Sequence, residues 1–363
     1  MIKKFFPIIL LTFVNVIGFS ILIPVLPQII RLYVPEHLIG VSYGILLSSY
    51  SLFQFIGAPI LGSLSDKYGR RPILFLSQLG TTLSWVIFAF AYFTPNLNFL
   101  GIGLPLYVIT LSRITDGITG GNISVANAWI SDMTTKEDKT KAFGLIGAMF
   151  GIGFLVGPAL GGLTTSFGIG YLGTIFTAFI ISLFTLLQIY FYLPESLPKE
   201  KRSNGKDKFN FLYELNILNK FKQFKNNKII TDLLFLRLFI AITFAAFTTI
   251  IILYMEHVFG LSPQKLGLTL SVVGLFSILN YALVTPKISK LIGNMNALYL
   301  ALFLISFSLV IIPFTPNNLF WGSINIGYII FIFETYITNL GIGLSLVTFK
   351  SLKNTPTEQA PWL

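Results

Sequence analysis

The sequence contains no cysteine and only two histidines, His37 and His257, which lie far apart along the chain. The absence of cysteine excludes disulfide bonds, thiolate metal sites and cysteine nucleophiles, and two distant histidines do not favour a metal site. Charge is scarce as well, because Asp, Glu, Lys and Arg make up only 11% of the residues and the mean hydropathy is +0.79. A soluble domain carries roughly twice that share of charged residues, so we expect an integral membrane protein.

Ten stretches of the chain are apolar enough and long enough to cross a bilayer, which takes about 20 residues of helix. They lie at 6–30, 39–64, 73–93, 99–130, 141–165, 170–192, 229–254, 264–285, 297–314 and 318–348. The fourth and tenth are unusually long, and we expect them to tilt or protrude. The first follows two lysines, as in a signal peptide, but it lacks a small-residue cleavage site and should remain as a helix. The predicted fold class is therefore all-α and polytopic.

The net charge of +11 raises the question of a nucleic-acid partner. All except four of the 25 Lys and Arg residues, however, fall in loops on one side of the predicted spans. The exceptions are Arg31 and Lys265 on the other side, and Arg113 and Arg237 within spans. Basic residues concentrate in cytoplasmic loops, so we predict cytoplasmic N- and C-termini and a lipid bilayer, with no nucleic acid, as the partner.

The spans divide the chain into three predicted regions. A six-span lobe covers 1–192, a polar stretch covers 193–228, and a four-span lobe covers 229–363. In the polar stretch, apolar residues from Phe211 to Phe224 recur at helical spacing among lysines. This pattern fits an amphipathic helix on the inner membrane surface and equally a solvated linker.

The second lobe resembles a shifted copy of the first. Span seven begins about 223 residues after span one, and the segment from Lys290 to Gly293 repeats the segment from Lys67 to Arg70 at nearly this offset. Repeated lobes are common in secondary transporters, with the solute site between them near the midplane. The same offset places the counterpart of span five near residue 364, so we expect ten helices of a twelve-helix plan.

The loop after the second span has the order G-x-x-x-D-K-x-G-R-R. Its glycines permit close helix contact and a tight reversal, and its charges form a cluster at the membrane face. The residues are Gly62, Asp66, Lys67, Gly69, Arg70 and Arg71. The inside-positive rule alone also produces charged loops. This order, however, resembles the signature of the major facilitator superfamily.

Span four agrees with that resemblance. It carries Arg113, Asp116, Gly117 and Gly121 and ends near Asp132, like the arginine-bearing motif of the superfamily's fourth helix.

Span five resembles the antiporter signature G-P-x-x-G-G through Gly153, Gly157, Pro158, Gly161 and Gly162. Glycines four residues apart give one helix face a groove for a neighbouring backbone, and Pro158 is expected to kink the helix. A dimerisation face is the alternative interpretation of the glycines.

The resemblance extends from span one into the tenth span and is nearest to the tetracycline-type multidrug efflux proteins. It implies a proton-coupled antiporter of the bacterial inner membrane that exports a small organic solute or drug by alternating access, without a cofactor. It also implies that Asp66 latches the inner face against an eleventh helix, which this chain lacks, and that Arg70 pairs with Asp132. Asn15 stands where these proteins typically have aspartate, so proton coupling must use another group.

Four ionisable residues lie clearly within spans: Arg113, Asp116, Arg237 and Glu334. Ionisable groups are costly in hydrocarbon, so we expect them to face protein or a wet cavity. Helices one, four, seven and ten line that cavity in the resembling family, which adds Asn15. Arg113 and Asp116 are three residues apart and can pair, either to exchange protons or as a fixed structural ion pair. Glu334 is our first candidate for binding a proton or cation; burial as a neutral carboxyl and pairing with Arg237 are the alternatives.

Other classes fit less well. A membrane enzyme needs a catalytic constellation, but no histidine lies within a span and no carboxylates cluster. A primary pump needs a phosphate-binding G-x-x-x-x-G-K-S/T loop, which does not occur. A channel is not distinguished from a transporter by the sequence. The strongest competitor is a truncated remnant that does not transport, or a chain that needs a partner to complete its second lobe.

Overall fold

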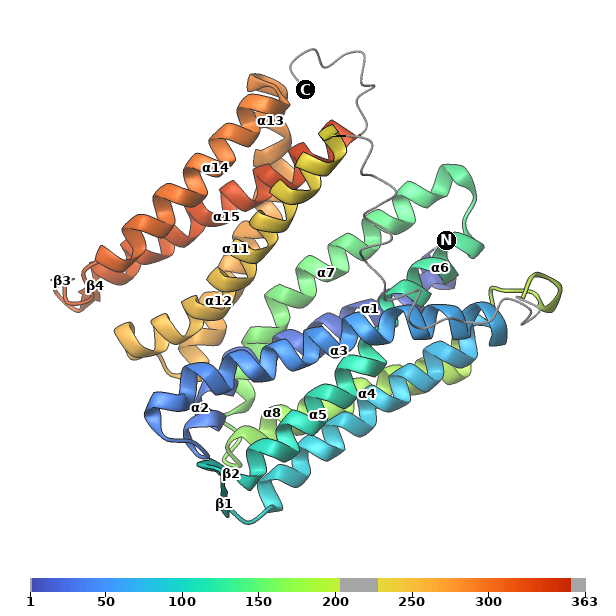
Figure 1. The fold of residues 1–363 in the computed structure, drawn as a ribbon, viewed down its shortest axis with the longest axis horizontal. Coiled ribbons are helices and arrows are strands. Elements are labelled where there is room, and N and C mark those ends of the chain that lie inside the picture. Colours follow the sequence, from blue (N-terminus) through green and yellow to red (C-terminus); the bar gives the residue numbers. More distant parts are fainter. Residues whose placement is uncertain (1, 203–227, 354–363) are drawn as a thin grey trace. The chain divides into compact units, whose positions relative to one another are not determined.

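The computed structural model describes residues 2–202 and 228–353, which form helices and two short β-hairpins (Figure 1). The chain divides into two compact units, Met1–Asn216 with Pro263–Gly267, and Ile217–Ser262 with Leu268–Leu363. We call them unit 1 and unit 2. The predicted amphipathic helix from Phe211 to Phe224 lies outside the described residues.

Unit 1 contains α1 (Ile2–Ser20), α2 (Leu26–Arg31), η1 (Glu36–Leu38), α3 (Ile39–Tyr68), α4 (Arg70–Phe93), β1 (Asn98–Phe99), β2 (Ile102–Gly103), α5 (Leu104–Gly120), α6 (Ile123–Met133), α7 (Lys136–Thr164), α8 (Tyr171–Tyr192) and η2 (Lys199–Lys201). Unit 2 contains α11 (Lys228–Phe259), α12 (Pro263–Leu279), the π-helix η3 (Asn280–Val284), α13 (Thr285–Ile292), α14 (Asn294–Ile311), η4 (Ile312–Phe314), β3 (Phe320–Trp321), β4 (Ile324–Asn325) and α15 (Ile326–Lys353). The first residues of α12 are grouped with unit 1.

Among the described residues, six helices have the length and composition to cross a membrane: Glu36–Tyr68, Arg70–Phe93, Tyr171–Tyr192, Phe235–Phe259, Asn294–Phe314 and Ile326–Ser345. Shorter apolar helices cover Phe6–Ser20, Gly151–Thr164 and Pro263–Leu279. Large apolar side chains such as Phe90, Phe191 and Phe303 are 61%, 66% and 61% exposed, as expected of helices that face lipid. A polytopic helical membrane protein is therefore confirmed, and ten crossings stay a prediction.

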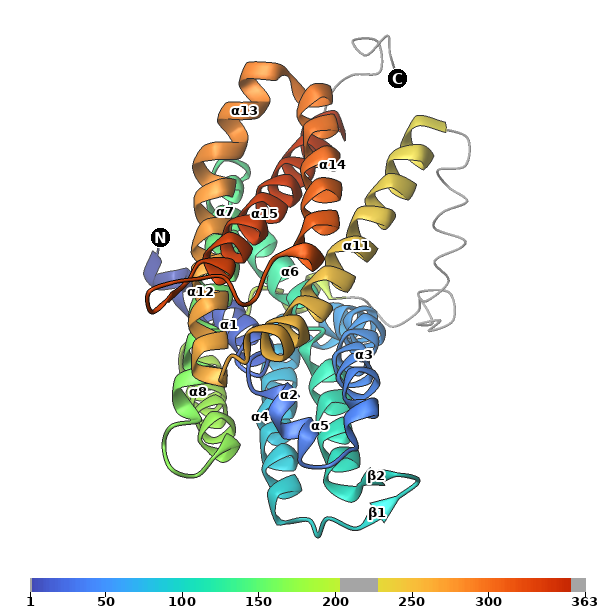
Figure 2. The same cartoon turned by 90° about the vertical axis from the view of Figure 1, so that its left-hand side faces the viewer.

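The two longest predicted spans begin with a hairpin, which explains their length. β1–β2 precedes α5 (Figures 1 and 2), and β3–β4 precedes α15 (Figure 1). Phe99 and other apolar residues of the hairpins extend the hydrophobic run, but Gly101 and Gly322 adopt φ of 81° and 61° and reverse the chain. The helices therefore begin at Leu104 and Ile326, later than predicted.

Two predicted spans are interrupted within their length. In the first, α1 and α2 are separated by a turn that contains Pro24, which has no backbone N–H to continue the helix. In the fourth, α5 and α6 are separated at Gly121 and Asn122. The Asn122 side chain is fully buried at this break and bonds to neighbouring helices. The break therefore brings a polar group into the interior of unit 1.

Unit 2 repeats part of unit 1 in structure. The order α4, β1–β2, α5 recurs as α14, β3–β4, α15, and the two hairpins start at Asn98 and Phe320, close to the offset that relates the lobes in sequence. Gly69 and Gly293, related by nearly the same offset, directly precede α4 and α14 with φ of 105° and 81°. Only glycine adopts such φ values without strain, so both halves use the same turn between two helices.

The contact between α1 and α7 depends on glycine. A Cβ at Gly157 would meet the Ser20 side chain, and one at Gly161 would meet the Ile21 backbone. The Ser20 hydroxyl also donates a hydrogen bond of 3.1 Å to the carbonyl of Gly153. Because apolar helices gain no hydrophobic energy by meeting inside lipid, this close approach and its van der Waals contacts hold the pair together.

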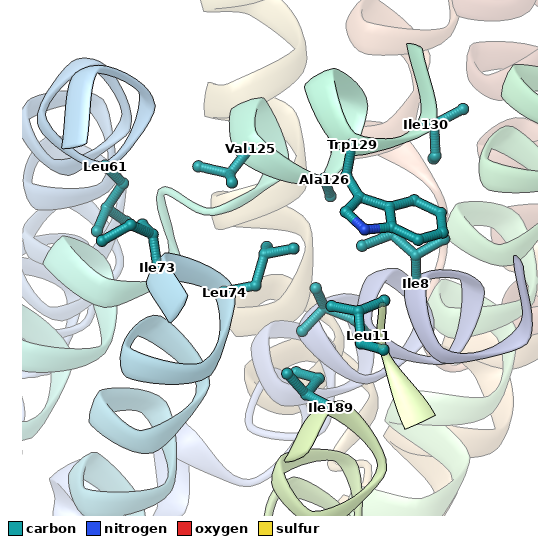
Figure 3. Packing of buried hydrophobic residues seen from close by; sticks show 11 residues of the cluster. Ile8, Leu11, Leu61, Ile73, Leu74, Val125, Ala126, Trp129, Ile130 and Ile189 are labelled. Carbon is teal, nitrogen blue, oxygen red and sulfur yellow. The ribbon is translucent and has the colours of Figure 1, made fainter. Parts of the chain in front are cut away.

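An apolar cluster joins α1, α3, α4, α6 and α8 in unit 1 (Figure 3). Trp129 of α6 is fully buried and packs in this cluster with Ile8 and Leu11 of α1. Its indole N–H donates to the carbonyl of Pro194, 2.8 Å away, so the buried ring leaves no unpaired donor. This bond also fixes the chain that follows α8 against α6.

We expect Gly157→Leu to reduce the yield of folded protein several-fold, because the new side chain must displace α1. Gly44→Leu is the matched control, since a Cβ at Gly44 in α3 meets nothing within 4 Å. Fluorescence-detected size-exclusion chromatography of both variants measures the effect. Equal monodisperse yields would show that α1 and α7 are not closely packed.

Candidate functional site

An ion pair lies in the interior of unit 1. Arg113 and Asp116 of α5 are each 4% exposed, and Arg113 Nη1 lies 3.2 Å from Asp116 Oδ2. The guanidinium carbon also lies over the rings of Trp85 and Phe88 in α4, 4.9 Å and 5.3 Å from their centroids. The positive charge is therefore shared between a carboxylate and two aromatic faces.

One edge of the guanidinium is less occupied. Arg113 Nη2 donates to the Ser112 hydroxyl at 3.3 Å, but Nε has no hydrogen-bond partner among the described residues. A buried guanidinium carries five donors, so this site retains donor capacity beyond the ion pair.

A small cavity, about the size of one water molecule, lies beside Asp116. Its polar lining comes from Asn15, Tyr50, Thr81, Asp116 and Ser182. These residues belong to α1, α3, α4, α5 and α8, so the cavity lies where five helices of unit 1 meet. The structure thus brings Asn15 and Asp116, two predicted site residues, to one polar space.

Asn15 is held by a chain of hydrogen bonds. Its Nδ2 donates to Asn122 Oδ1 at 2.7 Å, Asn122 Nδ2 donates to the Ser77 hydroxyl at 2.7 Å, and that hydroxyl donates to the carbonyl of Thr119 at 2.6 Å. The chain connects α1 to α4 and to the junction of α5 and α6. An amide can both donate and accept, so Asn15 joins this chain as a carboxylate could not.

The charged loop after α3 forms a compact network. Arg70 Nη1 lies 2.5 Å from Asp66 Oδ1, and Arg70 Nε lies 3.2 Å from Asp132 Oδ2. Lys67 and Arg71 are exposed at the same end, where Arg71 Nη2 donates to the carbonyl of Tyr190 at 2.6 Å. The motif arginine is thus the shared partner of two carboxylates from different helices.

Glu195 completes this network in a way that the sequence did not indicate. Its carboxylate accepts hydrogen bonds from the backbone N–H groups of Arg70 and Arg71 at 2.9 Å and 3.3 Å, and lies 3.6 Å from Arg202 Nη2. The first N–H groups of a helix have no partner within it, so Glu195 caps the start of α4. A Cβ at Gly69 would meet this carboxylate, which gives the motif glycine a second reason to be there.

In unit 2, Glu334 of α15 is 6% exposed and accepts a hydrogen bond of 2.5 Å from the Thr315 hydroxyl. One turn later, Thr338 donates to the Ser308 hydroxyl of α14 at 2.8 Å. Arg237 of α11 is exposed, and no ion pair joins it to Glu334 in the described part of the chain. The structure therefore does not bring these two predicted partners together.

The repeat relates the two buried sites. Ser84 of α4 corresponds to Ser308 of α14, and Asp116 of α5 corresponds to Thr338 of α15 at nearly the same offset. Glu334 lies one turn before Thr338, and both residues are buried on α15. Equivalent helices of the two units thus each hold one buried carboxylate, with an arginine partner in unit 1 and a hydroxyl partner in unit 2.

The remaining predicted glycines mark close contacts. A Cβ at Gly117 or Gly121 would lie 2.5 Å from the α3 backbone, at Tyr50 or Ala58. Gly62 is less constrained, because a Cβ there would lie 3.8 Å from the nearest atom. Pro158 and Gly162 are buried within α7, which is continuous through the proline.

A family model described as Major Facilitator Superfamily matches residues 8–360. The chain belongs to the major facilitator superfamily. It is therefore a membrane transporter rather than an enzyme, as predicted.

Relatives of this major facilitator chain include two tetracycline resistance proteins. The class H protein of Pasteurella multocida is 30% identical over 300 residues, which cover 83% of this chain and 70% of the relative. The class C protein of Escherichia coli is 32% identical over 284 residues, covering 78% and 67% of the two chains. The predicted resemblance to tetracycline-type efflux proteins is confirmed.

Solved structures agree on the fold. The human organic anion transporter MFSD10 matches with a TM-score of 0.63 at 21% identity, over 95% of this chain and 85% of that one. The nucleoside transporter NupG matches with a TM-score of 0.71 at 14% identity, over 97% and 84%. The predicted major facilitator fold is confirmed.

Sequence reasoning missed several residues of these sites. Asn122 and Ser77 lie within predicted spans but carry no ionisable group, and Thr315 lies just outside the predicted span 297–314. A wider search for any amide or hydroxyl within a span would have found Asn122, because asparagine is costly to bury in lipid without partners. Thr315 directly follows η4, and no pattern in the sequence around it predicts a contact with Glu334.

We expect Glu195→Gln to lower the Tm of the purified protein by a few degrees, because the helix cap loses its charge and Arg202 loses its partner. Glu200→Gln, an exposed change in the same segment, is the control and should leave Tm unchanged. Thermal unfolding in detergent measures both. An unchanged Tm in Glu195→Gln would mean that the cap adds nothing to stability.

Proposed function

We propose that this chain exports a small organic solute of the tetracycline type in exchange for protons, by alternating access between its two units. The observation that carries the proposal is the burial of one carboxylate in each unit, Asp116 and Glu334, on equivalent helices. The names of the relatives supply the solute class. Ionisable groups within membrane helices typically mark ion or proton pathways.

The Arg113–Asp116 pair is suited to couple a proton to a solute. A proton on Asp116 neutralises the carboxylate and leaves the Arg113 charge buried with two aromatic rings and no counter-ion. Breaking a buried pair by removing one partner costs about 3–5 kcal/mol. Proton binding is therefore favourable only when Arg113 gains another acceptor, and the unpartnered Nε offers a place for an oxygen of the solute.

Glu334 is suited to carry a proton without a charged partner. The Thr315 hydroxyl donates to the carboxylate, and the same hydroxyl can accept from the protonated acid, because it is both donor and acceptor. In both states the Glu334 carboxyl and the Thr315 hydroxyl remain hydrogen-bonded to each other. We therefore assign Glu334 the proton-carrying role and Arg113 with Asp116 the solute-coupling role, with Asn15 at the adjoining cavity and Arg237 a further candidate at the exposed face of α11.

We propose that the charged network at the end of α3 acts as a gate. Asp66 of α3 and Asp132 of α6 both pair with the buried Arg70, so a movement of α3 relative to α6 must break one of the two ion pairs. The basic residues of this loop support a position on the cytoplasmic side, and we propose that both termini lie on that side of a bacterial inner membrane. Gly62, Lys67, Gly69 and Arg71 shape and anchor the same loop.

The proposal is tested by uptake into inverted membrane vesicles. A proton gradient, acidic inside, should drive accumulation of tetracycline or a cationic dye in vesicles that contain this chain, and a protonophore should abolish it. Vesicles without the chain are the control. Uptake no greater than in these vesicles, from a chain that is folded and inserted, would overturn the proposal.

We expect Glu334→Gln to abolish gradient-driven uptake while solute binding changes less than about threefold, because glutamine keeps the hydrogen bond to Thr315 but carries no proton. Glu36→Gln, an exposed change in η1, is the matched control and should transport normally. Uptake and equilibrium binding of a fluorescent solute separate the two effects. Proton-driven uptake that persists in Glu334→Gln would exclude this carboxylate from coupling.

A further inference from the structure

A row of polar side chains without partners lies inside unit 2, away from Glu334. Asn280 and Thr285 are 0% exposed, and the hydroxyl of Ser289 is also inaccessible. Neither amide atom of Asn280 and neither hydroxyl has a hydrogen-bond partner among the described residues. Buried polar groups are almost always paired, so four such atoms in one place need an explanation.

The backbone places these side chains on one face. Asn280 begins the π-helix η3, and Thr285, five residues later, begins α13. A π-helix bonds each residue to the fifth along, and an α-helix repeats about every four residues, so Asn280, Thr285 and Ser289 follow one line. Pro286 lacks a backbone N–H and prevents a regular α-helix from continuing through this point, which accounts for the π-helix directly before it. α13 packs against α14 and α15, and η3 packs against α15.

Unit 1 fills the equivalent place differently. Counted back from the equivalent turn glycines Gly293 and Gly69, Ser289 corresponds to Ser65 and Thr285 to Leu61 of α3, because Gly293 N–H bonds to Ser289 as Gly69 N–H bonds to Ser65. The π-helix adds one residue to the unit 2 helix, so Asn280 corresponds to Gly57. A Cβ at Gly57 would meet the carbonyl of Ile118, so α3 and α5 touch there. Unit 2 has an amide in place of Gly57 and a hydroxyl in place of Leu61, together with a widened helix. The space between the helices of unit 2 is therefore polar where that of unit 1 is closed by backbone contact.

The chemistry of the four atoms selects their ligand. Asn280 Nδ2 needs an acceptor, Asn280 Oδ1 needs a donor, and each hydroxyl serves as either. A metal cation cannot accept from Nδ2, and an anion cannot donate to Oδ1. Water does both, and buried water typically makes about three hydrogen bonds to otherwise unpaired polar groups.

The line also reaches solvent at one end. Ser289 is half-buried and lies between Lys287 and Lys290, whose side chains are exposed. Asn280 lies nine residues away, which corresponds to about 13 Å at the rise of an α-helix. We propose that Asn280, Thr285 and Ser289 hold a file of ordered water molecules that enters unit 2 at the end where α13 meets α14 and reaches the π-helix.

The absence of cysteine from this chain allows a direct test. Thr285→Cys and Ala301→Cys each introduce one thiol at a position that is 0% exposed in unit 2, but Ala301 lies in an apolar cluster with Ala297 and Leu344. Each purified variant is treated with Ag⁺, a small cation that is bound by the hydrated thiolate, and the remaining thiol is labelled with a fluorescent maleimide after unfolding in detergent.

We expect Ag⁺ to block Thr285→Cys about tenfold faster than Ala301→Cys, because only a hydrated thiol ionises readily. Equal rates would overturn the proposal. If Thr285→Cys does not fold, Ser289→Cys replaces it with the same expectation.

A second measurement does not depend on thiols. Asn280→Leu keeps the branching and the number of side-chain heavy atoms, and it should lower Tm by several degrees if Asn280 binds water, because leucine leaves that water unpaired. If Asn280 lies in a dry interior, leucine removes an unsatisfied group and should raise Tm instead. A raised Tm would overturn the proposal independently of the proposed transport function.

Discussion

A polar group that faces the hydrocarbon of a bilayer has no water to bond with, and this constraint governs each part of the structure. Backbone groups are paired within helices, and the chain leaves the helical state at hairpins, turns and a few breaks. Where a helix begins, its free N–H groups still need acceptors, and Glu195 supplies them for α4. Where a helix is broken, as at Asn122, the polar side chain at the break bonds to neighbouring helices.

The same constraint leaves two ways for helices to meet. They can bring backbones into contact through glycine, as Gly157 and Gly161 do between α7 and α1. They can also meet through paired polar side chains, as Thr338 and Ser308 do between α15 and α14. Backbone contact through glycine fixes the distance between two helices. Contact through paired polar side chains keeps groups that can exchange protons or bind a solute. The residues to which we assign the proposed function, Asp116 and Glu334, have polar side-chain partners of the second kind.

Much of the fold follows from local sequence. Hydrophobic runs locate the helices, and the order of small and charged residues around Arg70 identifies the superfamily, because both signals lie within a few turns of chain. The hairpins before α5 and α15 did not follow, since apolar residues such as Phe99 occur equally in a span and in a short strand. The roles of Glu195 and Thr315 did not follow either. Glu195 meets Arg70 across 125 residues, and no periodicity encodes such a contact.

The spacing of Arg113 and Asp116 predicts that they can pair, but it does not predict the aromatic rings of α4 that share the arginine charge. That sharing bears on the proposed mechanism. A proton on Glu334 changes the buried charge of unit 2 by one unit and disturbs only a hydroxyl. A proton on Asp116 leaves the Arg113 cation without a counter-ion. The aromatic rings stabilise this cation only partly, since a cation–π contact contributes about 2 kcal/mol when desolvated. The rest of the stabilisation that the Arg113 charge then needs must come from a solute oxygen or from movement of α5. In the proposed cycle, unit 1 therefore cannot bind a proton alone, whereas unit 2 can, and this asymmetry links solute binding to proton binding.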